Sequence, residues 1–309
     1  MGAKVNILHV SDLHFGAEPT DRLSSLAVAV RKNTLTALME SLESIDPALK
    51  PDVVVVSGDI AWKGRKQDYS EAKAWLGRLL GILDLEPSDL ILCAGNHDVD
   101  ERKLGGLGLP TGAKQADEWL DPGQEGLSNL TRPFHNYISF CEDFGIPKLF
   151  IGSDSHHLLG CREVKGLRFL VLNSAWFCRR KDQEGRVDDN KKLWIGLPHL
   201  EVMQGNGELL SPTKYDESTI TVAVHHHPLE WLHDSDLNAR KARKNTYQYL
   251  AERCHIVLAG HSHPEAVQPA IRWSQGAHTF KGGATYAGND YFNIFSILNL
   301  GSLFWQGKT

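Results

Sequence analysis

The sequence predicts an α/β fold built around two sheets. The first hundred residues alternate between apolar, strand-like runs and segments with helical spacing, in the order β-α-β-α-β. Farther along, two strand patterns are joined by a tight turn, and a set of short strands follows near the C-terminus. The alternation is typical of a parallel sheet covered by helices, whereas adjacent strands joined by a turn indicate a second, partly antiparallel sheet.

Three continuous apolar runs predict the first sheet. They lie in VNILHV (5–10), DVVVVSGD (52–59) and LILCAGNHD (90–98). Runs this continuous cannot expose one face to water, so we expect buried parallel strands. Apolar residues at near three-four spacing predict the connecting helices over residues 23–42 and 69–83.

The middle of the chain predicts an insertion followed by the second sheet. Residues 99–124 are Gly-rich and without periodicity, which is typical of an insertion or lid loop rather than of a helix or strand. A helix is expected to resume over residues 133–144. Residues 156–176 then predict two strands joined through Lys165-Gly166. Later strands are expected in ITVAVHHHP, HIVLAGHSHP and FNIFSILNL, with a helix over 237–252.

Length and charge narrow the class of protein. With 309 residues, 41% hydrophobic and 23% charged, the chain is long enough to bury a large core, and we expect one domain over residues 1–309 with a lid-like insertion around 99–130. The formal net charge of -5 argues against a surface built mainly to bind nucleic-acid phosphates. Binding of a charged substrate would therefore need a local site.

Two features predict a cytoplasmic protein. No stretch approaches the roughly 18 apolar residues of a membrane span, and the N-terminus lacks the apolar segment of a secretory signal. The five cysteines are scattered and contain no CxxC pair, which suits a reducing compartment better than a disulfide framework. We expect no membrane partner.

Five of the strand-like runs end in polar clusters. These are SDLH at residues 11–14, GD at 58–59, GNHD at 95–98, HHHP at 225–228 and GHSH at 260–263. Ligands bind at the carboxyl ends of strands in α/β sheets, so the five clusters are expected to converge. Within the first cluster, Asp12 and His14 would lie on the same side of an extended chain.

The convergent side chains have the chemistry of a metal site. Carboxylates, an amide oxygen and imidazoles are donors suited to Mn, Fe, Zn or Mg. There are enough of them for two ions that share a bridging carboxylate. Such a pair can clamp a phosphoryl group and activate a water molecule, which predicts hydrolysis of phosphate esters.

In order and spacing, DLH, GD, GNHD, a strand-ending histidine and GHSH resemble the motifs of the calcineurin-like metallophosphoesterase superfamily. The resemblance implies a four-layer α/β/β/α sandwich of two mixed sheets, with a centre of two metal ions at the carboxyl ends of the strands. It implies that manganese is the first choice of metal and that a hydroxide bridging the ions attacks the substrate. Carried onto this sequence, it implies that Asp12, His14 and His263 hold one ion, that Asn96, His225 and His261 hold the other, that Asp59 bridges them, and that His97 is the catalytic residue that donates a proton to the departing oxygen.

The triple histidine leaves the choice of ligand open between two residues. Position at the end of the strand favours His225, and counting back from Pro228 favours His226. Successive side chains in a strand alternate, so both cannot face the site if the strand continues. We take His225 as the ligand and His226 as its partner or as a substrate contact.

Several substrate classes fit the motifs. GDIAWKGRKQDYSEA and HHHP resemble the cyclic-nucleotide-phosphodiesterase-like branch, whereas ILHVSDLHFG is similar to the opening of the repair-exonuclease branch. We predict a phosphodiesterase acting on a nucleotide-type substrate, because no arginine occurs inside GD, GNHD or GHSH to bind the extra charge of a monoester. The alternatives are a nuclease, a phosphomonoesterase or phosphoprotein phosphatase, and a metal-free binding scaffold. The basic runs at 179–181 and 240–244 are interpreted as solvated surface.

Overall fold

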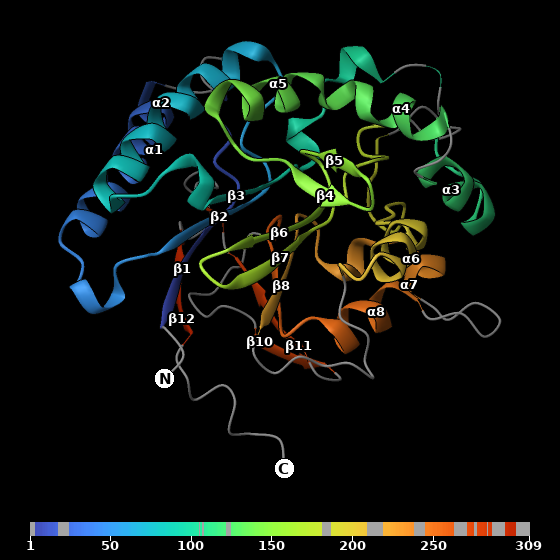
Figure 1. Ribbon diagram of the computed structural model, residues 1–309. Coiled ribbons are helices and arrows are strands. Elements are labelled where there is room, and N and C mark those ends of the chain that lie inside the picture. Colours follow the sequence, from blue (N-terminus) through green and yellow to red (C-terminus); the bar gives the residue numbers. More distant parts are fainter. Residues whose placement is uncertain are drawn as a thin grey trace.

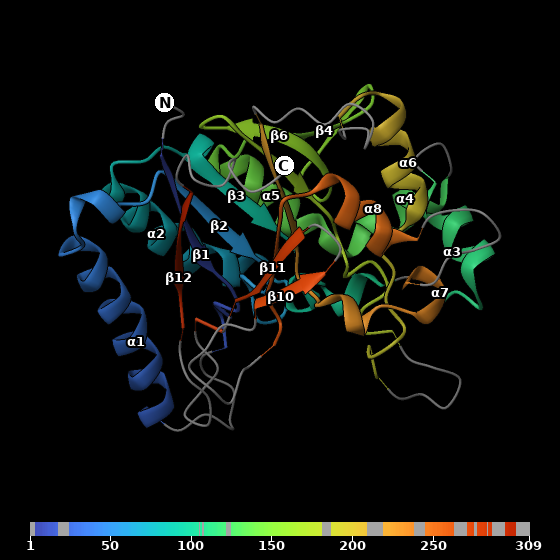
Figure 2. The ribbon, with the colours of Figure 1, turned by 90° about the horizontal axis from the view of Figure 1, so that it is seen from below.

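Two sheets lie face to face, and helices cover their outer sides (Figures 1 and 2). Seen in Figure 2, α1 and α2 lie outside one sheet and α6 and α8 outside the other. The predicted four-layer α/β/β/α arrangement is confirmed. The computed structural model describes residues 4–17, 25–104, 106, 108–121, 125–180, 187–208, 219–237, 245–262, 271–274, 277–282, 284–285 and 294–300.

The first sheet has the parallel core that the alternation predicts. Among the described residues its strand order is β12-β1-β2-β3, in which β1, β2 and β3 run parallel and β12 pairs antiparallel to β1. The strands are β1 (Val5–Val10), β2 (Val53–Ser57), β3 (Leu90–Cys93) and β12 (Ser296–Leu300), and the helices beside them are α1 (Ser25–Glu43), α2 (Lys66–Leu83) and α5 (His135–Phe144).

The second sheet is mixed. Its order within the described part of the chain is β10-β11-β9-β8-β7-β6-β4-β5, with β7, β8, β9 and β11 parallel and the hairpin of β6 and β7 antiparallel. Its strands are β4 (Leu149–Ile151), β5 (Asp154–His156), β6 (Gly160–Val164), β7 (Leu167–Val171), β8 (Ile220–His225), β9 (Ile256–Ala259), β10 (Ile271–Ser274) and β11 (Ala277–Lys281). The helices α6 (Leu197–Gly205), α7 (Asp234–Leu237) and α8 (Thr246–Arg253) lie on its side of the molecule.

Alternation along each strand divides the core into two parts. Val222 and Val224 of β8 belong to the apolar cluster between the sheets, which also contains Val53 and Val55 of β2. Ala223 belongs instead to the cluster formed with the covering helices. Side chains two residues apart on a strand therefore share a face. A residue that directly continues β8 keeps the same alternation of faces.

The predicted loop over residues 99–124 is only partly a loop. It contains the helix α3 (Ala113–Leu120), and α4 (Glu125–Thr131) follows. Ala116 and Leu120 of α3 are completely buried, so α3 packs onto the body of the protein. The sequence prediction failed here because the two buried residues, one turn apart, are too few to produce a visible helical pattern.

The sequence predicted neither a disulfide framework nor a membrane-spanning segment. All five cysteines are free and buried. In the described part of the chain, no helix combines the length and the apolar character that crossing a membrane requires.

Candidate metal centre

The loops that follow β1 and β2 run side by side. The backbone amide of Asp12 donates to the Gly58 carbonyl at 3.1 Å, and that of His14 donates to the Asp59 carbonyl at 2.9 Å. Asp12 and His14 have φ values of 56° and 49°, so the chain has left the extended conformation after Val10. The expectation of an extended chain at this point was therefore wrong. The two side chains nevertheless come within 3.8 Å of each other, because the left-handed turns direct both toward the second loop.

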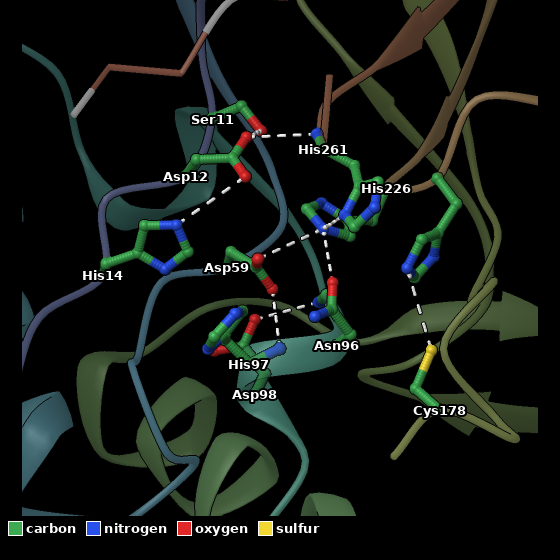
Figure 3. Close-up of polar contacts among 12 residues, drawn as sticks. Ser11, Asp12, His14, Asp59, Asn96, His97, Asp98, Cys178, His226 and His261 are labelled. Atoms are coloured by element: carbon green, nitrogen blue, oxygen red, sulfur yellow. Dashed lines mark hydrogen bonds and ion pairs between the residues drawn. The ribbon is translucent and has the colours of Figure 1, made fainter. Parts of the chain in front are cut away.

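Asp59 lies at the centre of the cluster (Figure 3). Its Oδ1 accepts the backbone amide of His97 at 2.7 Å, while its Oδ2 lies 3.3 Å from Nε2 of His226. The side chain is fully buried, and burial alone would raise the pKa of the carboxyl group; the charge of His226, with that of His97, outweighs burial and holds the pKa well below its usual range. Asp59 therefore stays ionised, with one oxygen directed at the loop of His97 and the other at the ring of His226.

Three side-chain atoms that can bind a metal lie close to Nε2 of His226. It lies 3.1 Å from Oδ1 of Asn96, 3.3 Å from Oδ2 of Asp59 and 3.3 Å from Nδ1 of His261. A ring nitrogen carries one proton or one lone pair, so it can satisfy only one of these atoms at a time. Oxygen and nitrogen donors gathered this closely are typical of a metal site, and the residues present fit a metal ion.

The orientation of the His226 ring also suits a ligand. Nδ1 donates to the backbone carbonyl of Ser57 at 2.8 Å, which leaves Nε2 to face the cluster. Metal-binding histidines commonly fix their second nitrogen in this way. The ring can approach this closely because residue 58 is glycine: its φ is 106°, and a Cβ there would collide with the His226 ring. Burial opposes protonation of His226, but Asp59 raises its pKa to about 9.

His225 faces away from this cluster. Its Nδ1 donates to the His227 carbonyl at 2.8 Å, and its Nε2 has no hydrogen-bond partner among the described residues. His225 is the last residue of β8 and shares its face with Ala223, whereas His226 follows Val222 and Val224 toward the space between the sheets. The structure therefore places His226, rather than the expected His225, in contact with Asn96, Asp59 and His261, as the alternation of β8 requires.

Asp98 supports the loops that carry Asp59 and Asn96. Its Oδ1 accepts the Ala61 amide at 2.9 Å and the Tyr69 hydroxyl at 3.0 Å, and its Oδ2 accepts the Gly95 amide at 2.9 Å. Burial, together with the charge of Asp59, raises its pKa to about 7. Neither spacing nor resemblance indicated a role for this last residue of GNHD, although its carboxylate ties the second and third loops together.

His97 lies beside the cluster in a fixed orientation. Its Nδ1 donates to the Trp62 carbonyl at 2.8 Å, its ring stacks on the Trp62 indole with centroids 4.4 Å apart, and the His14 ring is 4.7 Å away. Nη2 of Arg179 lies against the same ring, 2.7 Å from Nδ1 and 3.1 Å from Nε2. Burial lowers the pKa of His97, and the charge of Arg179 adds to that effect, although Asp59 acts in the opposite direction.

The structure thus brings together most of the residues that the motifs indicated. Three groups of side chains have donor atoms close enough to hold an ion, and Asp59 belongs to two of them. His263 lies outside the described residues, as do Lys181 and the basic run at 240–244. The groups are His14 with Asp59 and His97, Asp12 with Asp59 and His226, and His226 with His227 and His261.

Comparison with known proteins identifies the family. A family model described as calcineurin-like phosphoesterase matches residues 5–265. No curated protein matches the sequence. Among solved structures, the chain is similar to a phosphopantetheinyl hydrolase from Mycobacterium tuberculosis (15% identity, TM-score 0.41, covering 92% of this chain and 91% of that one). It is also similar to a dimetal phosphatase from Danio rerio (13% identity, TM-score 0.45, 91% and 87% covered) and to a purple acid phosphatase from yellow lupin seeds (13% identity, TM-score 0.45, 97% and 50% covered).

Proposed function

Since this chain belongs to the calcineurin-like phosphoesterase family and is a metal-dependent phosphoester hydrolase, we propose that its strand-end side chains hold two ions on either side of Asp59. The convergence of Asn96, Asp59 and His261 on Nε2 of His226 is the observation that supports this most strongly. In this proposal Asn96, His226 and His261 hold one ion. Asp12 and His14 hold the other, together with His263.

The chemistry follows from this arrangement. Two bound ions, for which manganese is our first choice, would polarise the phosphoryl oxygens of a substrate and lower the pKa of a water molecule between them. The chain's own residues supply position and protons. The Trp62 carbonyl accepts from Nδ1 of His97, so in the protonated ring Nε2 carries the proton that would pass to the departing oxygen.

Removal of metal tests the proposed function. Protein treated with a chelator is expected to lose hydrolysis of both p-nitrophenyl phosphate and bis(p-nitrophenyl) phosphate, and two equivalents of Mn²⁺ per chain are expected to restore it. Release of p-nitrophenol during the titration measures this directly. Hydrolysis that survives complete removal of metal, or that is absent with Mn²⁺, Fe²⁺, Zn²⁺ and Mg²⁺ alike, would contradict the proposal.

His226 and His225 provide a matched pair of variants, because they are neighbours and both are buried. We expect His226→Ala to weaken Mn²⁺ binding by more than about 100-fold, which is the upper end of the cost of losing a residue that only supports a ligand. His225→Ala is expected to bind Mn²⁺ as the unmodified protein does. Calorimetric titration with Mn²⁺ distinguishes the two, and the reverse order of effects would return the ligand assignment to His225.

A nucleotide-type phosphodiester is the substrate class that the sequence motifs favour. Two half-buried tryptophans flank the cluster: Trp62 stacks on His97, and the Trp231 ring lies 4.2 Å from that of His261. Aromatic side chains beside a phosphate site offer surfaces on which a base can stack. The charge argument for a diester is weakened, however, since Arg179 reaches His97 from outside the motifs. Cyclic nucleotides, dinucleotides and single-stranded DNA form the substrate panel for this candidate.

A further inference from the structure

Arg179 is held beside the metal centre by contacts on both its backbone and its side chain. It follows β7 in the chain and has a φ of 59°. Its backbone amide donates to the Asp189 carboxylate at 3.0 Å, which fixes the turn. Nε donates to the Asn96 carbonyl at 3.1 Å, so the guanidinium is anchored on the backbone of a proposed metal ligand.

The guanidinium has one side toward the cluster and one side toward solvent. Nη2 lies against the His97 ring, 2.7 Å from Nδ1 and 3.1 Å from Nε2, while Nη1 pairs with Glu101 at 2.6 Å. The Glu101 side chain is 58% exposed and that of Arg179 is 22% exposed, so this pair lies at the rim of the site, where water and solutes can reach it. Three described partners occupy the side chain, whereas a guanidinium has five N–H donors in a planar fork.

We propose that Arg179 binds a non-bridging oxygen of the substrate phosphate and thereby makes this enzyme favour dianionic phosphomonoesters over phosphodiesters. The inference rests on the proposed function, because it takes His97 as the residue beside the departing oxygen. A cation in contact with His97 is within reach of any phosphate held between the ions and that histidine. A monoester carries one more negative charge than a diester, so this cation stabilises the monoester more.

This assignment reverses the substrate class expected from the sequence. The prediction of a diester depended on the lack of arginine inside GD, GNHD and GHSH. Arg179 lies in a separate segment, and its contact with His97 spans more than 80 residues of the chain. A basic run in a loop gave no sign that one of its members would turn inward.

The test compares Arg179→Gln with Arg102→Gln. Arg102 is a suitable control because its guanidinium is bound to Asp100 and its side chain is 62% exposed. In the Mn²⁺-loaded protein we expect Arg179→Gln to lower kcat/KM for p-nitrophenyl phosphate by about 10- to 100-fold and to change bis(p-nitrophenyl) phosphate far less. Arg179→Lys keeps the charge without the planar fork. Its kcat/KM for p-nitrophenyl phosphate is expected to lie between the values of the unmodified protein and of Arg179→Gln. Arg102→Gln is expected to leave both values unchanged.

Two measurements separate this role from a purely structural one. Bound metal should remain at the unmodified level in Arg179→Gln, and calorimetry should show inorganic phosphate binding weakened by about 10- to 100-fold. Loss of metal, an equal fall for both substrates, or unchanged phosphate binding would overturn the inference. If the unmodified protein hydrolyses neither substrate, the proposed function fails, and phosphate binding alone decides this inference: weaker binding in Arg179→Gln supports it, and equal or absent binding overturns it.

Discussion

Replacing Asp59 with asparagine is expected to abolish hydrolysis and to lower the affinity for metal by more than about 100-fold. The carboxylate is fully buried, and its two oxygens face different partners, the His97 amide and the His226 ring. An amide keeps the shape but removes the charge that two cations would share. Elemental analysis after gel filtration, alongside turnover of p-nitrophenyl phosphate, measures both effects.

Asp89→Asn is the matched control for this substitution. Asp89 is also a buried carboxylate, but it precedes β3 at the opposite end of the strand and pairs with Lys165. Its variant should keep the metal content and activity of the unmodified protein. An Asp59→Asn protein that retains two ions per chain and normal turnover would disprove the bridging role.

His97→Ala is expected to lower kcat by about 10²- to 10⁴-fold while leaving the metal content unchanged. In the proposed arrangement His97 lies beside the ions rather than on one of them, and with Nδ1 at the Trp62 carbonyl it is Nε2 that would donate the proton from the protonated ring. Steady-state kinetics and elemental analysis on the same preparation test the two parts of this prediction.

The His97 ring stacks on Trp62, so the alanine variant also removes a packing contact. A second variant separates the loss of this contact from the loss of the proton donor. His97→Gln keeps a donor for the Trp62 carbonyl but cannot exchange a proton, so it should be as slow as the alanine variant. His135→Ala, at an exposed position, should be fully active. Loss of a metal ion from either His97 variant would make His97 a ligand and remove its assignment as the acid.

The sheets could be predicted because several of their strands are continuous apolar runs in the sequence. Val53–Ser57 and Ile220–His225 are buried at every position, as runs without polar alternation require. Since parallel strands end at a common edge, the polar clusters after them had to gather there. Asp12, His14, Asp59, Asn96 and His261 lie close together for this reason.

Other parts of the site could not be predicted from local patterns. The conformation of Asp12 and His14 depends on pairing with the loop after β2, which is distant in the sequence. The choice between His225 and His226 needed the alternation of β8 to be counted from its buried valines rather than from its last residue. Arg179 reaches His97 from a turn whose backbone amide is bound by Asp189, ten residues on, and such a contact leaves no periodic signal in the sequence.

Anomalous diffraction from a crystal of the Mn²⁺-loaded protein tests the central claim most directly. We expect two manganese peaks about 3.5–4 Å apart, on either side of the Asp59 carboxylate, with Nε2 of His226 bound to one of them. A single peak, no peak beside Asp59, or coordination by His225 in place of His226 would contradict the two-metal centre proposed for this chain.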